Sequence, residues 1–142
     1  MTAFRKIGIL LLLSFFFLTG CATLSPQRDE PMALKSRVAA LHQAKVEGDW
    51  SSVYDFFYSG YREKRTKTQF LSKPKGMNFK KFEVGKVEID PSGDSATVEV
   101  KEDFSYQGYD FDGYFKPQTW VKENGEWFFQ LDPKSKPFSE KS

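Results

Sequence analysis

The sequence is poor in the residues that most often carry redox and metal chemistry. Its 142 residues include one cysteine, Cys21, and one histidine, His42. A single cysteine excludes an intramolecular disulfide. Cys21 and His42 together supply only two of the four ligands that a structural zinc site needs. The sequence also lacks a glycine-rich phosphate loop and a nucleophile elbow. We therefore expect no metal and no cofactor.

The chain also lacks a charge excess outside its first residues. The formal net charge is +2, from 21 basic and 19 acidic residues. Arg5 and Lys6 belong to a segment that we expect to be removed, and without them the two signs balance. A neutral chain gives no electrostatic reason to bind nucleic acid.

The long apolar run near the amino terminus is too short to cross a membrane. It extends over residues 7–18, whereas a spanning helix needs roughly 20 apolar residues. Arg5 and Lys6 precede it, and small residues follow it. This order is typical of a signal peptide, which we predict over residues 1–20.

The residues Leu18-Thr19-Gly20-Cys21 close this run. They resemble the lipobox of bacterial lipoproteins, in which a leucine and two small residues precede an invariant cysteine. The resemblance implies cleavage before Cys21 and lipidation of its thiol, with palmitate among the acyl chains. Ala22 resembles the residue type that directs such proteins to the outer membrane, facing the periplasm. The alternative is a signal-anchor helix that contains a cysteine by chance.

The remainder divides into a tether, one domain and a tail. Residues 21–30 show no apolar periodicity and are predicted to form a lipidated tether. Residues 31–132 are long enough for one domain. The polar residues 133–142 are predicted to be a disordered tail.

Helical spacing predicts three helices in the first half of this domain. Pro31 suits the first turn of a helix that Gly48 ends. Asp49 is placed to cap a second helix, which we expect to continue to Gly60. Thr66 begins a capping box and a short third helix through Leu71. The basic run at residues 62–67 is interpreted as a solvated segment between helices, with lipid head-group contact as the lesser reading.

The second half changes to the alternation of strands. A first strand through Phe82–Ile89 changes phase at Gly85, which predicts a bulge. A second strand runs from Ala96 through Tyr106, and Gly108 and Gly113 are expected to bracket a short loop or irregular edge. Residues 114–122 and 126–131 are predicted to form a hairpin around Asn124-Gly125, with Trp120 opposite Phe129.

Helices followed by an antiparallel sheet indicate an α+β domain. The segment Val46–Trp50, the aromatic second helix and the closing hairpin Trp120–Trp127 carry a further resemblance. Together they resemble the nuclear-transport-factor-2-like superfamily, the cystatin-like α+β cones, over residues 31–132. The resemblance implies amino-terminal helices packed on a curved, bulged antiparallel sheet that encloses a pocket.

Glu102 is the one weak candidate for a catalytic residue, and no other is predicted. Strand alternation places it on the same face as Val98, Val100 and Phe104. A carboxyl group among such side chains has a raised pKa and could act as a general base. The alternatives are a bulge at Glu102 or a wet strand end. His42, at the edge of the first helix's apolar stripe, is interpreted as a surface or packing residue.

Six aromatic residues are candidates for lining a ligand pocket. They are Tyr54, Phe57, Tyr58, Phe104, Trp120 and Phe129. The alternative is that these rings form the core, with the tyrosine hydroxyls at its rim.

Two functions follow from these observations. The first is a non-catalytic envelope lipoprotein whose domain binds a protein partner or a small apolar ligand. Val121 and Phe128, on the face opposite Trp120 and Trp127, could join a homodimer or an envelope partner. The second is an isomerase- or dehydratase-like enzyme that uses Glu102 and a tyrosine.

Overall fold

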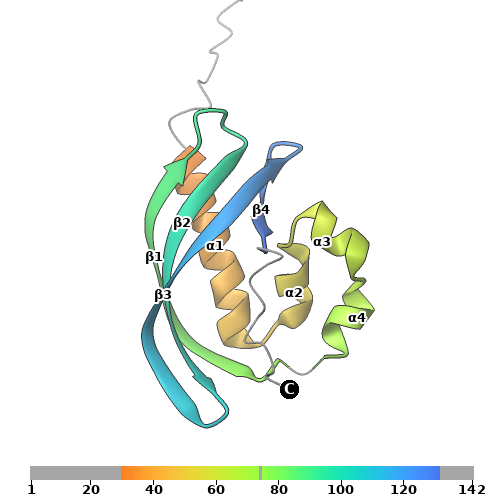
Figure 1. The fold of residues 1–142 in the computed structure, drawn as a ribbon, viewed down its shortest axis with the longest axis vertical. Helices are drawn as coiled ribbons and strands as arrows, with labels where there is room; N and C mark the ends of the chain where they lie inside the picture. Colours follow the sequence, from red (N-terminus) through yellow and green to blue (C-terminus); the bar gives the residue numbers. More distant parts are fainter. Residues whose placement is uncertain (1–29, 74, 132–142) are drawn as a thin grey trace, which may run out of the picture.

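The computed structural model describes residues 30–73 and 75–131. In this part of the chain, helices precede a four-stranded antiparallel sheet, so the predicted α+β class is confirmed (Figure 1). None of the described helices is long and apolar enough to span a membrane. The predicted signal peptide, lipobox and carboxy-terminal tail lie outside the described residues.

Helix α1 covers Glu30–Glu47 and supplies the main helical face of the core. Its buried residues recur at three- and four-residue spacing, as the sequence predicted: Leu34, Val38, Leu41, His42 and Ala44. Gly48 follows with a φ of 72°, a left-handed conformation that glycine adopts without strain. The predicted end of this helix is confirmed.

Helix α2 is shorter than predicted. It covers Trp50–Asp55, and the Asp49 side chain caps it by accepting from the Ser52 backbone N–H at 3.1 Å. The helix stops because the next residues pair with the sheet: Phe57 forms a parallel bridge with Phe129. The single helix that we predicted through residue 60 is therefore wrong.

Helices α3, Ser59–Lys64, and α4, Lys67–Leu71, complete the helical part. Helix α3 was not predicted, and it contains part of the basic run that we had placed between helices. Gly60 lies inside it rather than at a helix end. The Thr66 capping box is confirmed, since its side chain accepts from the Gln69 backbone N–H while the Gln69 side chain accepts from the Thr66 N–H.

The sheet is a meander in the order β1-β2-β3-β4. Its strands are β1, Met77–Ile89; β2, Ser95–Tyr106; β3, Tyr109–Glu123; and β4, Glu126–Gln130. The β2–β3 hairpin extends past the helices (Figure 1). Its two strands pair up to a two-residue turn, Gln107-Gly108, because both turn residues take positive φ. Of the short loop or irregular edge that we expected between Gly108 and Gly113, the loop is wrong: the segment is strand, and its irregularity is a register shift near Gly113.

Three register shifts interrupt the described sheet. Two lie between β1 and β2: one between Phe79 and Lys81, and one between Val84 and Val87, which confirms the bulge predicted at Gly85. The β2–β3 register shifts between Glu102 and Phe104. There β3 contributes the extra residue, and Gly113 takes a φ of 63° while its N–H donates to the Asp103 carboxylate at 2.7 Å.

The closing hairpin has the predicted register. Asn124 and Gly125 form its turn with φ values of 52° and 83°. Trp120 then pairs with Phe129, and Lys122 pairs with Trp127. A two-residue turn with positive φ at both positions matches the twist of the flanking strands, which is why this signal predicted the register correctly.

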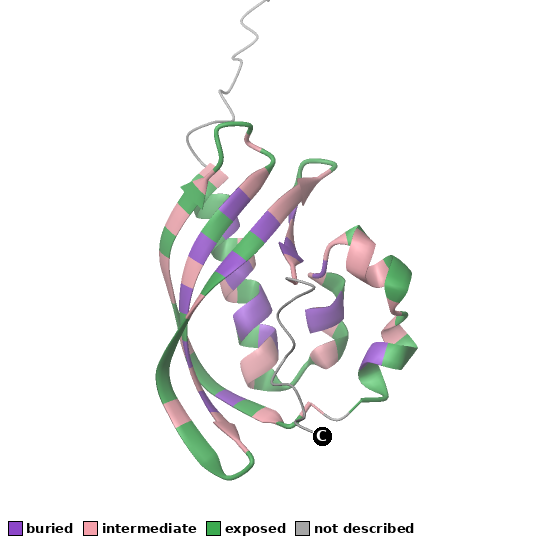
Figure 2. Ribbon diagram, in the orientation of Figure 1, coloured by how far each residue is buried: buried purple, intermediate pink, exposed green. Residues whose placement is uncertain are grey.

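The core lies between α1 and the sheet and extends under α2 and α4 (Figure 2). Trp120 is fully buried at its centre, together with Leu34, Val38, Leu41 and Val98. Every member of this core lies between residues 34 and 129. No residue before Glu30 therefore contributes to the packing of the described core.

Candidate functional site

A buried polar contact joins α1 to β2 inside this core. Nδ1 of His42 lies 2.7 Å from Oε1 of Glu102. His42 is 1% exposed and Glu102 is 6% exposed. The predicted inward direction of Glu102 is confirmed. The bulge beside it leaves the residue buried, because the extra residue belongs to β3 and not to β2.

Two further side chains complete this cluster, which we call the Glu102 network. Lys45, one turn after His42 on α1, donates from Nζ to Oε1 of Glu102 at 3.1 Å. Gln118 of β3 lies on the other side of the imidazole, with its Nε2 3.0 Å from Nε2 of His42. The network thus joins α1, β2 and β3 through Lys45, His42, Glu102 and Gln118.

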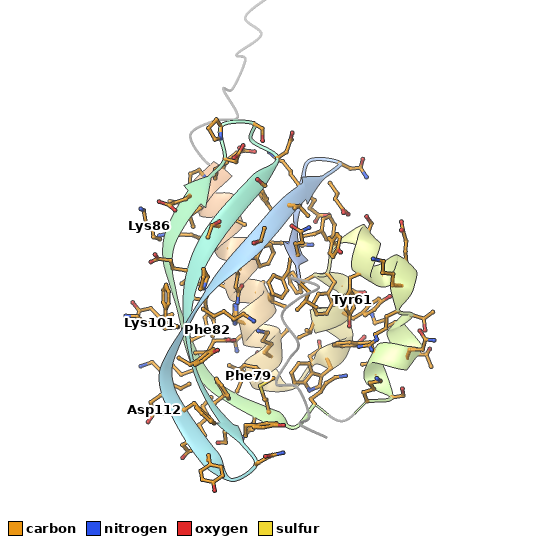
Figure 3. All side chains as sticks on the ribbon, in the orientation of Figure 1. Tyr61, Phe79, Phe82, Lys86, Lys101 and Asp112 are labelled. Atoms are coloured by element: carbon orange, nitrogen blue, oxygen red, sulfur yellow. The ribbon has the colours of Figure 1, made fainter. Side chains whose placement is uncertain are left out.

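Apolar surfaces enclose these polar groups. The His42 ring packs against Phe82 with 5.6 Å between centroids, and Phe82 pairs with Glu102 across β1 and β2. The Lys45 ammonium lies 4.9 Å from the centroid of Phe79. Both phenylalanines lie on the helix side of the sheet, whereas Lys86 and Lys101 lie on the opposite side (Figure 3).

Glu102 is ionised in these surroundings. Burial raises its pKa, but hydrogen bonding to His42 and the nearby Lys45 ammonium outweigh this effect, and the pKa falls to about 2. The raised pKa that we predicted is therefore wrong. The sequence placed Glu102 correctly on a buried face, but it did not show that α1 supplies a cation and a hydrogen-bond donor at that position.

His42 is neutral because burial has the larger effect on its pKa. Burial lowers its pKa below the usual 6.5, and the hydrogen bond to Glu102 only partly offsets this effect. Burial also lowers the pKa of Lys45, against the attraction of Glu102. Of the two interpretations of His42, the surface residue is wrong and the packing residue is right, since the ring is 1% exposed and packs on Phe82. Its contact with Glu102 was not predicted.

These states determine which ring nitrogen carries the proton. An ionised carboxylate can only accept, so Nδ1 of His42 must donate to Glu102. Nε2 of a neutral ring then carries a lone pair, and the Gln118 amide N–H donates to it. The arrangement is a directed chain from Gln118 through His42 to Glu102.

This series of hydrogen bonds is suited to fixing structure rather than to moving protons. Both imidazole nitrogens are engaged within the protein, and a carboxylate with a pKa of about 2 is a weak base near neutral pH. What the network does is hold α1 in one register on β2 and β3. Breaking a buried charge pair by removing one partner typically costs about 3–5 kcal/mol.

Four of the six aromatic pocket candidates meet in the core instead of lining a hollow. Tyr54, Phe57, Phe129 and Trp120 form a continuous series of ring contacts, with centroid separations of 6.4, 5.8 and 5.7 Å. The Tyr54 hydroxyl donates to the Arg65 carbonyl at 2.7 Å. The core alternative is thus confirmed for these rings. Tyr58 is half-buried at the start of α3.

The remaining candidate, Phe104, belongs to a second aromatic group. Its ring lies 5.0 Å from Phe111, 5.6 Å from Phe79 and 5.6 Å from Tyr114. This group covers the base of the projecting β2–β3 hairpin. We call residues 103–115 of that hairpin the arm.

The best-defined hollows of the described surface lie elsewhere. One is lined mainly by residues 88–90 and 95–97, and the other by Glu83, Gly85, Glu99, Lys101 and Phe115. Neither is lined by Glu102 or by any of the six aromatic candidates. Within residues 30–73 and 75–131, no cluster of three or more potential metal ligands occurs.

A signal for the Glu102 network was present in the sequence. His42 and Lys45 follow Val38 at spacings of four and seven, which places both on the apolar face of α1. Glu102 lies on the apolar face of its strand. Polar residues of opposite sign on the buried faces of two elements predict a contact between those elements.

No known protein-family model matches the chain, and no curated protein matches it significantly.

Proposed function

We propose that this protein is a lipid-anchored bacterial envelope lipoprotein whose α+β domain binds a protein partner without catalysis. The observation that carries the binding role is the exposure of large aromatic side chains on the arm. Tyr109 is 72% exposed, Phe115 50% and Tyr114 41%. Aromatic residues are enriched in protein interfaces, because each ring buries a large area at a low entropic cost.

The two faces of the arm are both available to a partner. Tyr114 contacts Phe104 at its helix-side face, whereas Phe115 pairs with Lys101 and lines an outer hollow. The core rings already pack against one another, so a protein contact at the arm is better supported than a small apolar ligand inside the domain. Phe128 is less available than we expected, since the Arg37 and Arg62 guanidinium groups lie 5.4 and 5.1 Å from its ring centroid.

The anchor is proposed from the lipobox resemblance of Leu18–Cys21. A thiolate is a strong nucleophile, and it is the group to which lipoprotein processing transfers diacylglycerol. Several acyl chains anchor a protein firmly, since each buried methylene contributes about 0.8 kcal/mol. Ala22 supports placement in the outer membrane.

The order of the helices and the sheet, together with the bulges of the sheet, supports the nuclear-transport-factor-2-like cone as the finer description of the fold.

Two experiments test the two halves of this proposal. Metabolic labelling with palmitate should mark the wild-type chain and leave the Cys21→Ser variant unmarked; an equally labelled variant would overturn the anchor. For the binding role, a photo-crosslinking amino acid is placed in the arm at Tyr109 or Phe115. The matched control position is Thr97, which is exposed on β2 outside the arm.

A crosslinked species of one defined mass at both arm positions, absent at Thr97, is the expected result. A product of twice the chain mass would identify the partner as a second copy. Absence of any product at the arm, in cells where the protein is correctly localised, would overturn the proposed role of the arm.

The isomerase- or dehydratase-like alternative has less support. It needs Glu102 as a base beside a tyrosine hydroxyl in a shared cavity. Glu102 instead accepts from His42 and Lys45, and its pKa is about 2. The Tyr54 hydroxyl is committed to the backbone of Arg65.

A further inference from the structure

The balanced charge of the chain hides a strongly uneven distribution. Residues 62–75 contain six basic residues and one acidic residue, a net charge of +5. The other described residues, 30–61 and 76–131, contain nine basic and fifteen acidic residues, a net charge of −6. The domain is therefore a charge dipole with its positive end on α3 and α4.

This positive end forms one side of the molecule. Helices α3 and α4 lie beside α2, on the side away from β1 and β2 (Figure 1). The basic residues between 62 and 75 are Arg62, Lys64, Arg65, Lys67, Lys73 and Lys75. We call this surface the α3–α4 basic face.

Most of these cations are not neutralised. Lys67 pairs with Asp55 at 2.7 Å, and Arg62 lies 4.0 Å from Glu123. The other four cations form no ion pair within the described part of the chain; they are Lys64, Arg65, Lys73 and Lys75. A surface that gathers cations without matching carboxylates has an unfavourable self-energy, which an external anionic surface relieves.

Two of these cations are close enough to repel each other. Burial lowers the pKa of Lys75, and the nearby Arg65 guanidinium lowers it further. Lys75 is held there by contacts with α4: its ammonium donates to the Phe70 carbonyl and lies 3.7 Å from the centroid of the Phe70 ring. The contacts with α4 thus hold the Lys75 ammonium within the electrostatic influence of Arg65.

An apolar residue lies among the cations. Leu71, the last residue of α4, is 45% exposed. Leu71 lies between Lys67 and Lys73 in the sequence. An exposed aliphatic side chain in a basic segment is typical of protein surfaces that contact a membrane interface, where cations meet phosphate groups and the apolar group enters the head-group layer.

We infer that the α3–α4 basic face rests on the anionic phospholipid headgroups of the membrane to which the protein is anchored. This inference rests on the proposed lipid anchor for its geometry. The eight residues between Cys21 and Glu30 reach at most ~30 Å, and α1 is ~27 Å long. The tether therefore allows the domain to lie on its side, with α3 and α4 against the surface and the acidic remainder away from it.

The test uses a chain of residues 22–142, which lacks the anchor and retains the entire core. It is mixed with vesicles of phosphatidylcholine, alone or with about one third phosphatidylglycerol, and the bound fraction is measured by flotation. We expect binding to the anionic vesicles only. Salt at ~1 M should abolish it, because the Debye length falls to about 3 Å.

Matched charge reversals locate the contact. Lys64→Glu with Lys73→Glu changes two exposed residues of the basic face that make no described ion pair, and should weaken vesicle binding at least about tenfold. Lys81→Glu with Lys101→Glu makes the same change of charge at exposed positions of the sheet and should have a much smaller effect. Both variants are checked for unchanged thermal unfolding, and glutamine replaces glutamate if either is destabilised.

Equal binding to neutral vesicles, no binding to anionic vesicles, or equal losses in the two variants would overturn the inference. These outcomes are separate from the fate of the proposed anchor. Failure of palmitate labelling would remove the anchor and leave the vesicle result standing, whereas failure of flotation would leave a lipid-anchored domain that does not lie on the surface.

Discussion

Nδ1 of His42 donates a hydrogen bond to the carboxylate of Glu102 across 2.7 Å, between α1 and the second strand of the sheet. The contact is buried, and it couples the only histidine of the chain to the only buried carboxylate among the described residues. Lys45 and Gln118 fix its two ends. The pKa values of His42, Lys45 and Glu102 are all shifted by this arrangement.

The tautomer of His42 is the most direct prediction. We expect a neutral ring protonated at Nδ1, because Glu102 is ionised and Gln118 donates to Nε2. Nitrogen-detected NMR of labelled histidine should show this tautomer at pH 7. Its titration should lie below pH 6.5, because burial lowers the pKa of the side chain from that usual value. A ring protonated at both nitrogens at pH 7 would contradict the arrangement.

Removal of Glu102 should cost more stability than removal of any exposed carboxylate. Glu102→Ala leaves the Lys45 ammonium and the His42 N–H without their acceptor, and we expect a loss of about 3–5 kcal/mol in the free energy of unfolding. The matched control is Glu99→Ala on the outer face of the same strand, with an expected loss below about 1 kcal/mol. Urea unfolding measures both. Similar losses would show that the network contributes little.

Stability should fall in acid in two stages. The folded state keeps His42 neutral, so the unfolded state binds its proton more readily below pH 6.5 and becomes favoured as the pH falls. The slope from one such proton is at most ~1.4 kcal/mol per pH unit. The His42→Gln variant should lack this first stage, which urea unfolding between pH 8 and pH 5 would show.

The second stage belongs largely to Glu102. Its pKa falls from 4.5 to about 2 on folding, so its contribution of about 3 kcal/mol is complete above pH 4.5 and is lost as the pH falls towards 2. Asp49, Asp90 and Asp110 also have lowered pKa values and share this range. The Glu102→Gln variant isolates the contribution: its stability should decline less steeply than that of the wild type below pH 4.5. Equally steep losses of stability in the variant and the wild type below pH 4.5 would contradict this contribution of Glu102.

Trp120 should be the most costly aromatic residue to truncate. It is fully buried and pairs with Phe129 at the centre of the core. We expect Trp120→Ala to lower the free energy of unfolding by about 3–5 kcal/mol. Trp120→Phe should cost much less, because its indole N–H has no acceptor within the described residues and no hydrogen bond is lost. A loss below 1 kcal/mol for the alanine variant would contradict the observed packing.

Local signals in the sequence determined much of the fold. The caps at Asp49 and Thr66, the end of α1 at Gly48, the bulge at Gly85 and the hairpin at Asn124-Gly125 all formed as predicted. Each depends on the conformation or hydrogen bonding of a few neighbouring residues. Short-range physics of this kind can be assessed without knowledge of the rest of the chain.

The errors came where distant segments meet. The aromatic spacing through Phe57 favoured one long second helix, but pairing with Phe129 ends it early, because the backbone groups of residues 56–58 bond to β4. Only the segment between Gly108 and Gly113 of the arm was mistaken for a loop or irregular edge. Gly108 forms the turn and Gly113 the bulge of a hairpin only when the two strands are paired. Helix α3 carries too many charges to show an apolar stripe.

The sequence by itself determined that this protein contains an α+β domain, and it placed Glu102 on the inner face of its strand. Only the tertiary structure decided what that carboxylate does. The pKa of a buried group depends on which charges and donors come within a few ångströms of it. Those groups come from another helix and another strand, so the same glutamate that suggested a general base instead has a pKa of about 2 and holds α1 to the sheet.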